Sequence, residues 1–252
     1  RRRQARWRSS VSVPEPALPA AARDLLDSAA PGAMTEIAGA ELFGTMGIPT
    51  PPGRVLAPGE AVPDEIGFEG PYVLKVVSAD IAHKSDAAGV ALGLADHAAL
   101  AAALATMRNA VAQRRPDARI EGFLVQQMTR GLAEVIIGFT RDPVTGPMIS
   151  VGVGGVMTEI YRDLSLRPAP VTADEAAAMI AEVRGFALLR GYRGAPHGDV
   201  DALARAVAAV SHLAHHPLVQ EAEINPLMVG AEGKGVTAAD ALVILGPQGD
   251  AP

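Results

Sequence analysis

Short apolar runs, bounded by glycine, proline or polar residues, recur along the chain and predict its β-strands. Most contain β-branched or aromatic residues and are too short for helices, which is typical of strands buried in a sheet. The predicted strands cover residues 71–78, 90–94, 120–128, 133–139, 147–153, 219–224 and 236–244.

Other segments place apolar residues at helical spacing. In residues 96–115, Leu100, Leu104, Met107 and Val111 follow one another at i, i+4, i+7 and i+11. This spacing predicts a helix with one buried face. A second helix of this kind is predicted over 35–46, and the interleaving of helices with strands predicts a mixed α/β (α+β) fold.

Helix-capping residues mark two further helices. Thr172 and Glu175 have the spacing of a capping box, which opens a helix reaching about Arg184. Asp199 precedes another run at helical spacing and is its predicted N-cap.

The bulk composition narrows the classes of function. The chain has 252 residues, 49% of them hydrophobic, a net charge of −6 and no cysteine. A large core is therefore possible, disulfides and thiolate metal sites are excluded, and no broad basic face for nucleic acid is expected. No apolar run reaches the roughly 20 residues of a membrane helix. We expect a cytoplasmic protein without membrane or nucleic-acid partners.

Residues 1–32 are rich in arginine, proline and alanine. This composition favours disorder and lacks the long apolar segment of a secretory signal. We expect a mobile basic tail with a short helix over 21–28, and order beginning near Met34.

Lys75 interrupts the apolar strand at 71–78, among Tyr, Val and Leu. An unpaired ammonium is costly to bury there. Lys75 therefore either has an anionic partner or lies on an edge strand, from which its stem reaches solvent.

The segment 79–90, ADIAHKSDAAGV, combines His83 with a lysine, a serine, an aspartate, small residues and a glycine. Backbone N–H groups in such a loop can point at phosphate oxygens. Many surface turns have a similar composition, so both interpretations stay open on this segment alone.

Gln126 and Glu134 bring polar side chains into two apolar strands that a short glycine-containing turn would join. This hairpin would suit the ribose and base edge of a nucleoside, although a hairpin with one solvent-facing side has the same pattern. Gly154 and Gly155 end the next strand, where flexible backbone often borders a ligand.

Asn225 in EINPL and Asp240 in AADAL are separated by a predicted hairpin over 227–235. An amide oxygen and a carboxylate on adjacent strands suit Mg²⁺, which prefers hard oxygen ligands and shares them with phosphates. Asn-Pro is also a common turn signal.

The order of these features separates the alternatives: strand lysine, phosphate loop, LVQ hinge with a following glutamate, GGV, and EINPL with a late aspartate. In this order the chain resembles the ATP-grasp subunit of NDP-forming acyl-CoA synthetases, which include the β subunits of ADP-forming acetyl-CoA synthetase and, more distantly, succinyl-CoA synthetase. The resemblance runs from about Met34 to Leu245 and is carried by KVVSADIAHKSDAAGV, IEGFLVQQM, RDPVTGP, VGVGGVMTEIYRDLSLRPAP, ALLRGYRGAP and EINPLMV.

This resemblance implies an ATP-grasp fold with a small subdomain over 33–126, a large subdomain over 127–247 and ATP or GTP between them. It implies that Asn225 and Asp240 hold Mg²⁺. The other residues that it assigns to the cleft are Lys75 on the α- and β-phosphates, Ser85, Gly89 and Val90 over the triphosphate, Gln126, Gln127 and Met128 at the adenine-side hinge, and Glu134, Gly154 and Gly155 along its walls.

The resemblance also implies that His83 accepts the phosphoryl group and carries it between sites. An imidazole suits this role, since it titrates near neutrality and is nucleophilic when neutral; the alternative is a histidine that only hydrogen-bonds within its loop. The chain shows no glycine-rich Rossmann turn for CoA. A CoA-binding α-type subunit or domain is therefore the expected partner, in a hetero-oligomer.

Four residues depart from the pattern of the family. Ala88 replaces a common glycine, Gln127 a frequent proline, Thr145 a usual aromatic and Leu242 a common basic residue. They leave the substrate branch and the rate open. Two rival functions also stay open, a carboxylate–amine ligase of the ATP-grasp type and a nucleotide-sensing module of a protein acetyltransferase system. Candidate anion contacts near the cleft or a subunit interface are Arg162, Arg167, Arg190 and Arg193.

Overall fold

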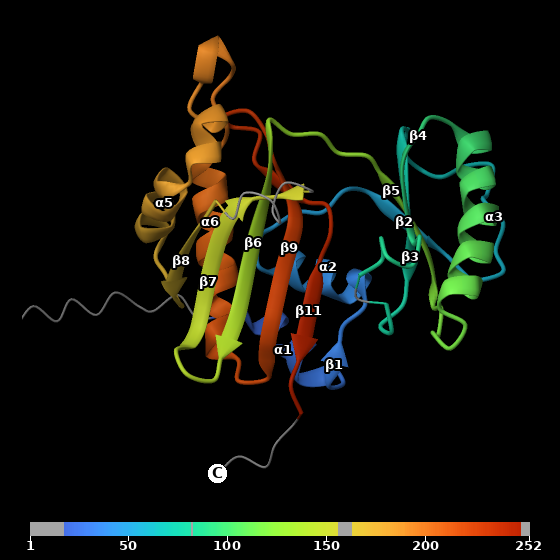
Figure 1. Ribbon diagram of the computed structural model, residues 1–252, viewed down its shortest axis with the longest axis horizontal. Coiled ribbons are helices and arrows are strands. Elements are labelled where there is room, and N and C mark those ends of the chain that lie inside the picture. Colours follow the sequence, from blue (N-terminus) through green and yellow to red (C-terminus); the bar gives the residue numbers. More distant parts are fainter. Residues whose placement is uncertain (1–17, 82, 156–162, 248–252) are drawn as a thin grey trace, which may run out of the picture.

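The computed structural model describes residues 18–81, 83–155 and 163–247. They form two antiparallel sheets with helices packed against them, so the expected α+β class is confirmed (Figure 1). Among these residues no helix combines the length and apolarity that crossing a membrane requires.

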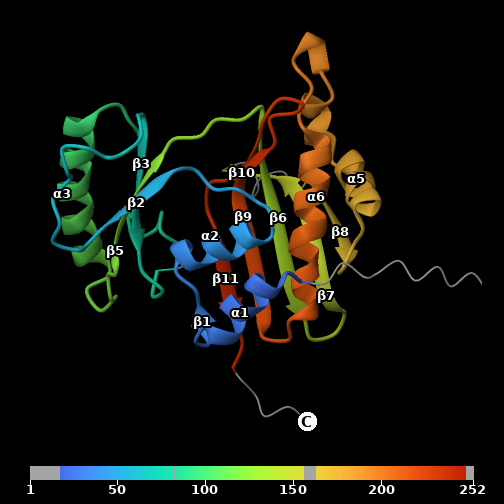
Figure 2. The ribbon, with the colours of Figure 1, turned by 180° about the vertical axis from the view of Figure 1, so that it is seen from behind.

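The larger sheet has seven strands in the order β1-β11-β9-β6-β7-β8, with β10 paired to β9. Helices α1 (Ala20–Ser28), α2 (Glu36–Thr45) and α6 (Val200–Ser211) lie on the face seen in Figure 2, and α5 (Ala173–Glu182) packs beside α6. Together they bury the larger hydrophobic core. The strand bounds are β1 Gly32–Ala33, β6 Ala133–Asp142, β7 Gly146–Val153, β8 Leu164–Pro168, β9 Val219–Val229, β10 Val236–Ala238 and β11 Leu242–Leu245.

The smaller sheet has four strands in the order β2-β5-β3-β4. Helix α3 (His97–Arg114) covers it and buries the four residues predicted for its inner face, which form a second core with the strands. The strand bounds are β2 Gly53–Leu56, β3 Tyr72–Val77, β4 Val90–Leu94 and β5 Gly122–Gln127. Short 3-10 helices complete the chain: η2 Arg184–Leu189, η3 Tyr192–Gly194 and η4 His212–His215.

The predicted capping residues are confirmed. Thr172 and Glu175 form a reciprocal capping box at the start of α5, and the side chain of Asp199 accepts a hydrogen bond from the Ala202 N–H at the start of α6. These bonds satisfy backbone N–H groups that have no partner within the helix.

The expected tail over 1–32 is too long. Leu18, Ala22 and Leu26 are buried in the larger core, and β1 pairs with β11. Residues 18–32 are thus part of the fold, while residues 1–17 lie outside the described ranges. The arginine, proline and alanine content of the whole segment obscures the helical spacing of its second half.

Helix α2 also differs from the expected division of the chain. Its buried residues Leu42 and Phe43 belong to the larger core, although the boundary expected at residue 33 assigns them to the small subdomain. Only after residue 52 does the chain enter the smaller sheet, at β2.

The hairpin expected between residues 120–128 and 133–139 does not form. β5 belongs to the smaller sheet and β6 to the larger, so the segment between them crosses from one sheet to the other. At Gly131 the crossover passes so close to β9 that an added Cβ would lie 2.7 Å from the Val229 carbonyl oxygen. Apolar periodicity identifies a strand but does not specify its neighbour.

Candidate nucleotide-binding site

Lys75 projects from the interior of the smaller sheet. Its strand β3 lies between β5 and β4, and the residue is 5% exposed. Its Nζ donates to Glu36 Oε1 at 2.5 Å and also to the carbonyl oxygen of Ala239. The anionic partner expected for a buried lysine is present, and the alternative of an edge-strand lysine reaching solvent is wrong.

Lys84 and Asp240 complete a cluster of alternating charges around this ammonium group. Lys84 Nζ lies 3.0 Å from Glu36 Oε2 and 2.8 Å from Asp240 Oδ1. Lys75 Nζ lies 4.0 Å from the same Asp240 oxygen. We call Glu36, Lys75, Lys84 and Asp240 the charge cluster; its two positive and two negative groups balance, which lowers the cost of burying them.

Burial and pairing act in opposite directions on the pKa values of this cluster. Burial raises the pKa of Asp240, but Lys75 and Lys84 outweigh it and hold that pKa below its ordinary value. Burial lowers the pKa of Lys84, but Glu36 and Asp240 together raise it above its ordinary value. Burial raises the pKa of Glu36 and the two lysines oppose the rise; with ammonium nitrogens 2.5 and 3.0 Å from its two oxygens, Glu36 is the ionised counter-charge of the lysines. Asp240 is therefore ionised and Lys84 protonated at neutral pH.

The loop that carries His83 is anchored to β3 at Gly89. The Gly89 N–H donates to the Lys84 carbonyl, and the Gly89 carbonyl accepts from the Val76 N–H, both at 2.8 Å. A Cβ on Gly89 would collide with the side chain of Val76. Ala88 has a φ of 55°, in the left-handed region that favours glycine, so the departure from the family pattern at this residue places strain in the loop.

A cavity of about 520 Å³, here called the central cavity, opens between the two sheets and contains most of the predicted cleft residues. Gln126 and Glu134 both line it, although they come from different sheets and not from one hairpin. The predicted residues along its wall are Lys75, Ser85, Val90, Gln126, Gln127, Met128, Glu134, Gly155, Asn225 and Asp240.

The predicted hinge has part of its backbone already engaged. The N–H groups of Gln127 and Met128 donate to the carbonyls of Pro52 and Pro71, each at 2.9 Å, and Gln126 is buried. A base edge at this wall would therefore be recognised by groups other than these two N–H donors.

Gly154 and Gly155 let the end of β7 approach β6 closely. A Cβ on Gly154 would lie 2.6 Å from the carbonyl carbon of Val135, whose backbone cannot move aside. Gly155 has a φ of 69°, and its N–H donates to Asn225 Oδ1 at 3.1 Å. The carboxylate of Glu134 occupies the space where a Gly155 side chain would lie. Gly155 lines the central cavity, whereas Gly154 and Gly89, also predicted there, do not line it.

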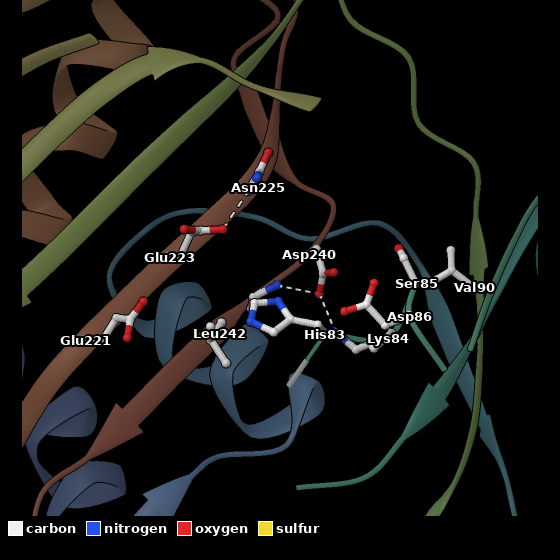
Figure 3. A pocket seen from close by; sticks show the side chains of 11 residues that line it. His83, Lys84, Ser85, Asp86, Val90, Glu221, Glu223, Asn225, Asp240 and Leu242 are labelled. Carbon is white, nitrogen blue, oxygen red and sulfur yellow. Dashed lines mark hydrogen bonds and ion pairs between the residues drawn. The ribbon is translucent and has the colours of Figure 1, made fainter. Parts of the chain in front are cut away.

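A second cavity, of about 340 Å³, adjoins the first; we call it the histidine cavity. Figure 3 shows His83 and Lys84 entering it from their loop, and Glu221, Glu223 and Asn225 entering it from β9. The two cavities share Ser85, Val90, Asn225 and Asp240.

Glu223 lines the histidine cavity outside the charge cluster, and its pKa is raised above the ordinary value. Burial raises its pKa, as do the nearby Glu221 and Asp240, while a hydrogen bond from Asn225 Nδ2 at 3.4 Å opposes the rise. The acids on this side therefore repel one another and favour a cation between them.

The donor set fits Mg²⁺ bound together with phosphates. The Asn225 amide oxygen and the Asp240 carboxylate are hard oxygen donors that line both cavities. Within the described ranges no group of three or more His, Asp and Glu side chains is placed to hold a metal. Mg²⁺ at a nucleotide commonly takes one or two protein ligands and completes its shell with phosphate and water oxygens.

Three residues of the site are absent from the sequence-based prediction. Glu36 stands in the first turn of a helix, where an acid usually faces solvent and favours the dipole. Lys84 follows His83 in the histidine loop, and Glu223 stands two residues before Asn225. In both motifs the sequence-based prediction assigns a function to the neighbouring residue instead. The positions of these three residues relative to the neighbouring apolar residues do not indicate that their side chains are buried or face the site.

Three of the four arginines expected near the cleft or a subunit interface do not line either cavity. Arg167 pairs with Glu182, and Arg190 donates to the Ala181 carbonyl. Neither these two nor Arg193 line the central or the histidine cavity. Arg162 lies outside the described residues.

The family model of the ATP-grasp domain matches residues 27–245. Since this match covers most of the chain and agrees with two antiparallel sheets around a charged cavity, the chain belongs to the ATP-grasp domain family.

Two relatives are similar over most of this chain. The first is the ADP-forming acetate–CoA ligase I of Archaeoglobus fulgidus, 44% identical over 188 residues, which cover 74% of this chain and 27% of that protein. The second is the β subunit of ADP-forming acetate–CoA ligase I of Pyrococcus furiosus, 36% identical over 209 residues, which cover 81% of this chain and 88% of that subunit. The chain thus spans about a quarter of the first relative and nearly all of the second.

A solved structure has the same architecture. It is the dinucleotide-forming acetyl-coenzyme A synthetase 1 of Candidatus Korarchaeum cryptofilum, in complex with coenzyme A and Mg-AMPPCP, with its phosphohistidine segment pointing towards the nucleotide-binding site. The TM-score is 0.71 at 31% identity, over 89% of this chain and 99% of that one.

Proposed function

We propose that this chain is the nucleotide-binding, β-type component of an ADP-forming acetate–CoA ligase. It binds ATP or GTP with Mg²⁺ in the central cavity and moves a phosphoryl group between the nucleotide and His83. The observation that carries the proposal is the adjacency of the two cavities. Lys75 lines one, His83 lines the other, and Asn225 and Asp240 line both.

The triphosphate lies at the charged end of the central cavity. Lys75 provides fixed positive charge there, and Lys84 provides it from the adjoining histidine cavity. Such preorganised charge stabilises the charge that develops on a transferring phosphoryl group. The base lies towards Gln126–Met128, where Val73, Leu92 and Met228 give the wall an apolar surface.

Asn225 and Asp240 hold the metal ion. When bound, Mg²⁺ neutralises phosphate charge and aligns the phosphate oxygens for in-line transfer. The protein's contribution is to keep the amide and the carboxylate at the boundary between the two cavities, where the terminal phosphate meets the histidine loop.

His83 is the acceptor of the phosphoryl group. An unprotonated ring nitrogen of His83 attacks the γ-phosphorus, and the bond from this phosphorus to the β,γ-bridging oxygen breaks, leaving the nucleoside diphosphate with the electron pair. The phosphoryl group then passes to the carboxylate of the acid. CoA displaces phosphate from the resulting acyl phosphate, so acid, CoA and ATP give acyl-CoA, ADP and phosphate, and every step is reversible.

A CoA-binding α-type subunit or domain supplies the acyl-transfer half of this reaction. The chain corresponds to nearly all of a Pyrococcus β subunit but only 27% of the Archaeoglobus ligase. A hetero-oligomer, or a fused protein, is therefore the working form.

Labelling with [γ-³²P]ATP and Mg²⁺ tests the assignment of His83. Wild-type protein should acquire an acid-labile, base-stable label, and His83→Asn should acquire none. His215→Asn is the matched control, because His215 is exposed and lines neither cavity; it should label normally.

Adding a purified CoA-binding α-type subunit with acetate and CoA should then discharge the label and produce acetyl-CoA. Nucleotide binding without any label on His83 would favour a carboxylate–amine ligase. Binding without acyl-CoA formation by any α-type partner would favour a nucleotide sensor. Either result would overturn the proposal.

A further inference from the structure

We infer that Glu36 is a positioning residue of the nucleotide site: its buried carboxylate holds the ammonium groups of Lys75 and Lys84 side by side, facing the phosphates. This inference rests on the proposed function, because it requires a nucleotide in the central cavity. It assigns a role in binding to a residue that touches neither cavity.

The contacts of Glu36 divide between the two lysines. Oε1 accepts a hydrogen bond from Lys75 Nζ at 2.5 Å, and Oε2 lies 3.0 Å from Lys84 Nζ as an ion pair without hydrogen-bond geometry. One lysine comes from strand β3 and the other from the loop that carries His83. A single carboxylate thus fixes two cations from separate segments.

Burial shows that Glu36 acts through the lysines. Its side chain is 1% exposed, so a ligand cannot reach it. Leaving a carboxylate there unpaired would be costly, and this cost forces both ammonium groups to remain in place. As the first residue of α2, the carboxylate also gains from the positive end of the helix dipole.

Asp240 cannot replace Glu36 in this role. Asp240 also contacts Lys84, at 2.8 Å, and Lys75, at 4.0 Å, but it is the residue assigned to Mg²⁺. Once its oxygens bind a metal ion, Glu36 is the anion that still separates the two ammonium groups. Without it, two like charges in a region of low dielectric constant would repel each other and turn away from the phosphates.

The consequence extends to His83, because Lys84 is its neighbour in the chain. The carboxylate of Glu36 that holds Lys75 on β3 also holds Lys84, and therefore the part of the histidine loop next to His83. Glu36 therefore links the place of phosphate binding to the place of phosphoryl acceptance, from a helix that belongs to the larger core.

The test is Glu36→Gln, which keeps the shape and removes the charge. Binding of Mg-ADP and of adenosine should be measured by calorimetry, well below the unfolding temperature. We expect ADP affinity to fall about ten- to a hundredfold, in keeping with the loss of a charged hydrogen-bond partner, and adenosine affinity to stay unchanged. A purely structural role would reduce thermal stability without changing this ratio. Glu41→Gln, an exposed position on the same helix, should bind both ligands like the wild type.

A second variant keeps the test decisive. If like-charge repulsion causes the loss, adding Lys84→Met to Glu36→Gln should recover part of the ADP affinity, since Lys75 then keeps its place at the phosphates without a second ammonium group beside it. A double variant that binds ADP more weakly than Glu36→Gln would contradict the inference.

The opposite electrostatic outcome would also overturn it. Removing one negative charge leaves the cluster with a net positive charge, so ADP binding that is equal or tighter in Glu36→Gln would mean that the lysines need no positioning. If wild-type protein binds no nucleotide, the proposed function itself fails, which separates the two results.

Discussion

The two sheets bring opposite charges to the same pair of cavities. The smaller sheet and its loop contribute the cations, whereas nearly all of the acids come from the larger sheet and its helix α2. Among the described residues that line the cavities, Asp86 of the histidine loop is the one acid from the smaller side. The lining cationic or basic residues are Lys75, His83 and Lys84, and the lining acids of the larger side are Glu134, Glu221, Glu223 and Asp240. Glu36 of α2 lines neither cavity but pairs with both lysines.

This separation matches the two parts of a metal–nucleotide. Phosphate oxygens need positive charge, and Mg²⁺ needs oxygen donors. A bound metal–nucleotide would therefore join the positive groups of the smaller sheet to the acids of the larger sheet. The charge cluster makes the same contact directly, since Lys75 and Lys84 reach Glu36 and Asp240 across the boundary. The groups that we propose to bind the nucleotide therefore also join the two halves of the molecule.

The largest effect is expected when Lys75, the buried cation of the smaller sheet, is removed. Lys75→Met leaves Glu36 buried with Lys84 as its remaining partner, and we expect the free energy of unfolding to fall by about 3 kcal/mol. Nucleotide affinity should fall about a hundredfold or more, as for truncation of a buried charged partner. Urea denaturation and calorimetry with Mg-ADP measure the two effects.

Lys234→Met is the matched control for this variant. Lys234 is exposed on the hairpin between β9 and β10, so its replacement should change stability by less than about 0.5 kcal/mol. If Lys75→Met bound nucleotide as well as this control, the cations of the smaller sheet would have no part in binding.

The cationic residues of the smaller sheet and its loop, here called the cationic half, can be predicted from the sequence. A lysine inside an apolar strand and a histidine in a loop of small residues are unusual in their local sequence. Lys75 is buried and paired, as its setting predicts. The acids of the larger sheet and helix α2, here called the acidic half, are harder to predict. Glu36 looks like an ordinary acid in a first helical turn, and only the packing of α2 across the boundary makes it part of the site.

The pairing of strands is the other feature that local patterns do not determine. The strands that carry Gln126 and Glu134 are correctly expected, yet their connection crosses between sheets and does not form a hairpin. Strand periodicity describes which face is buried, while the choice of partner depends on contacts distant in sequence, such as that of Gly131 with Val229. The strands β1 and β2, of two and four residues, are too short for a period to be recognised.

A smaller effect is expected from Ala88→Gly, which relieves backbone strain in the loop that carries His83 and Lys84 without changing the charge of that loop. Ala88 has a φ of 55°, which costs a residue with a Cβ about 1–2 kcal/mol. Ala88→Gly removes that strain but gives the unfolded chain more freedom. We expect a net gain in unfolding free energy of about 0.5–1 kcal/mol, measured by urea denaturation.

The neighbouring Ala87 provides the contrast. It is buried in the smaller core and has no positive φ, so Ala87→Gly should destabilise the protein by about 1 kcal/mol. Equal effects at both positions would mean that the left-handed conformation of Ala88 stores no strain.

The smallest effect concerns the acidic half and depends on pH. Burial raises the pKa of Glu223 above its ordinary value. The folded state therefore holds this proton more tightly than the unfolded chain does. The resulting stabilisation is fully present below the unfolded pKa, near 4.3, and is lost as pH rises through the folded pKa.

Glu223→Gln removes this titration, so it should raise the unfolding free energy at pH 7 by less than about 0.5 kcal/mol, and the gain should vanish as pH approaches 4. Stability curves of the variant and the wild type from pH 4 to 8 measure this difference. Glu232→Gln, exposed on the hairpin between β9 and β10, should leave the curve unchanged. A Glu223→Gln gain that grew towards low pH would reverse the sign, and the acids of the larger sheet would then not repel one another across the histidine cavity.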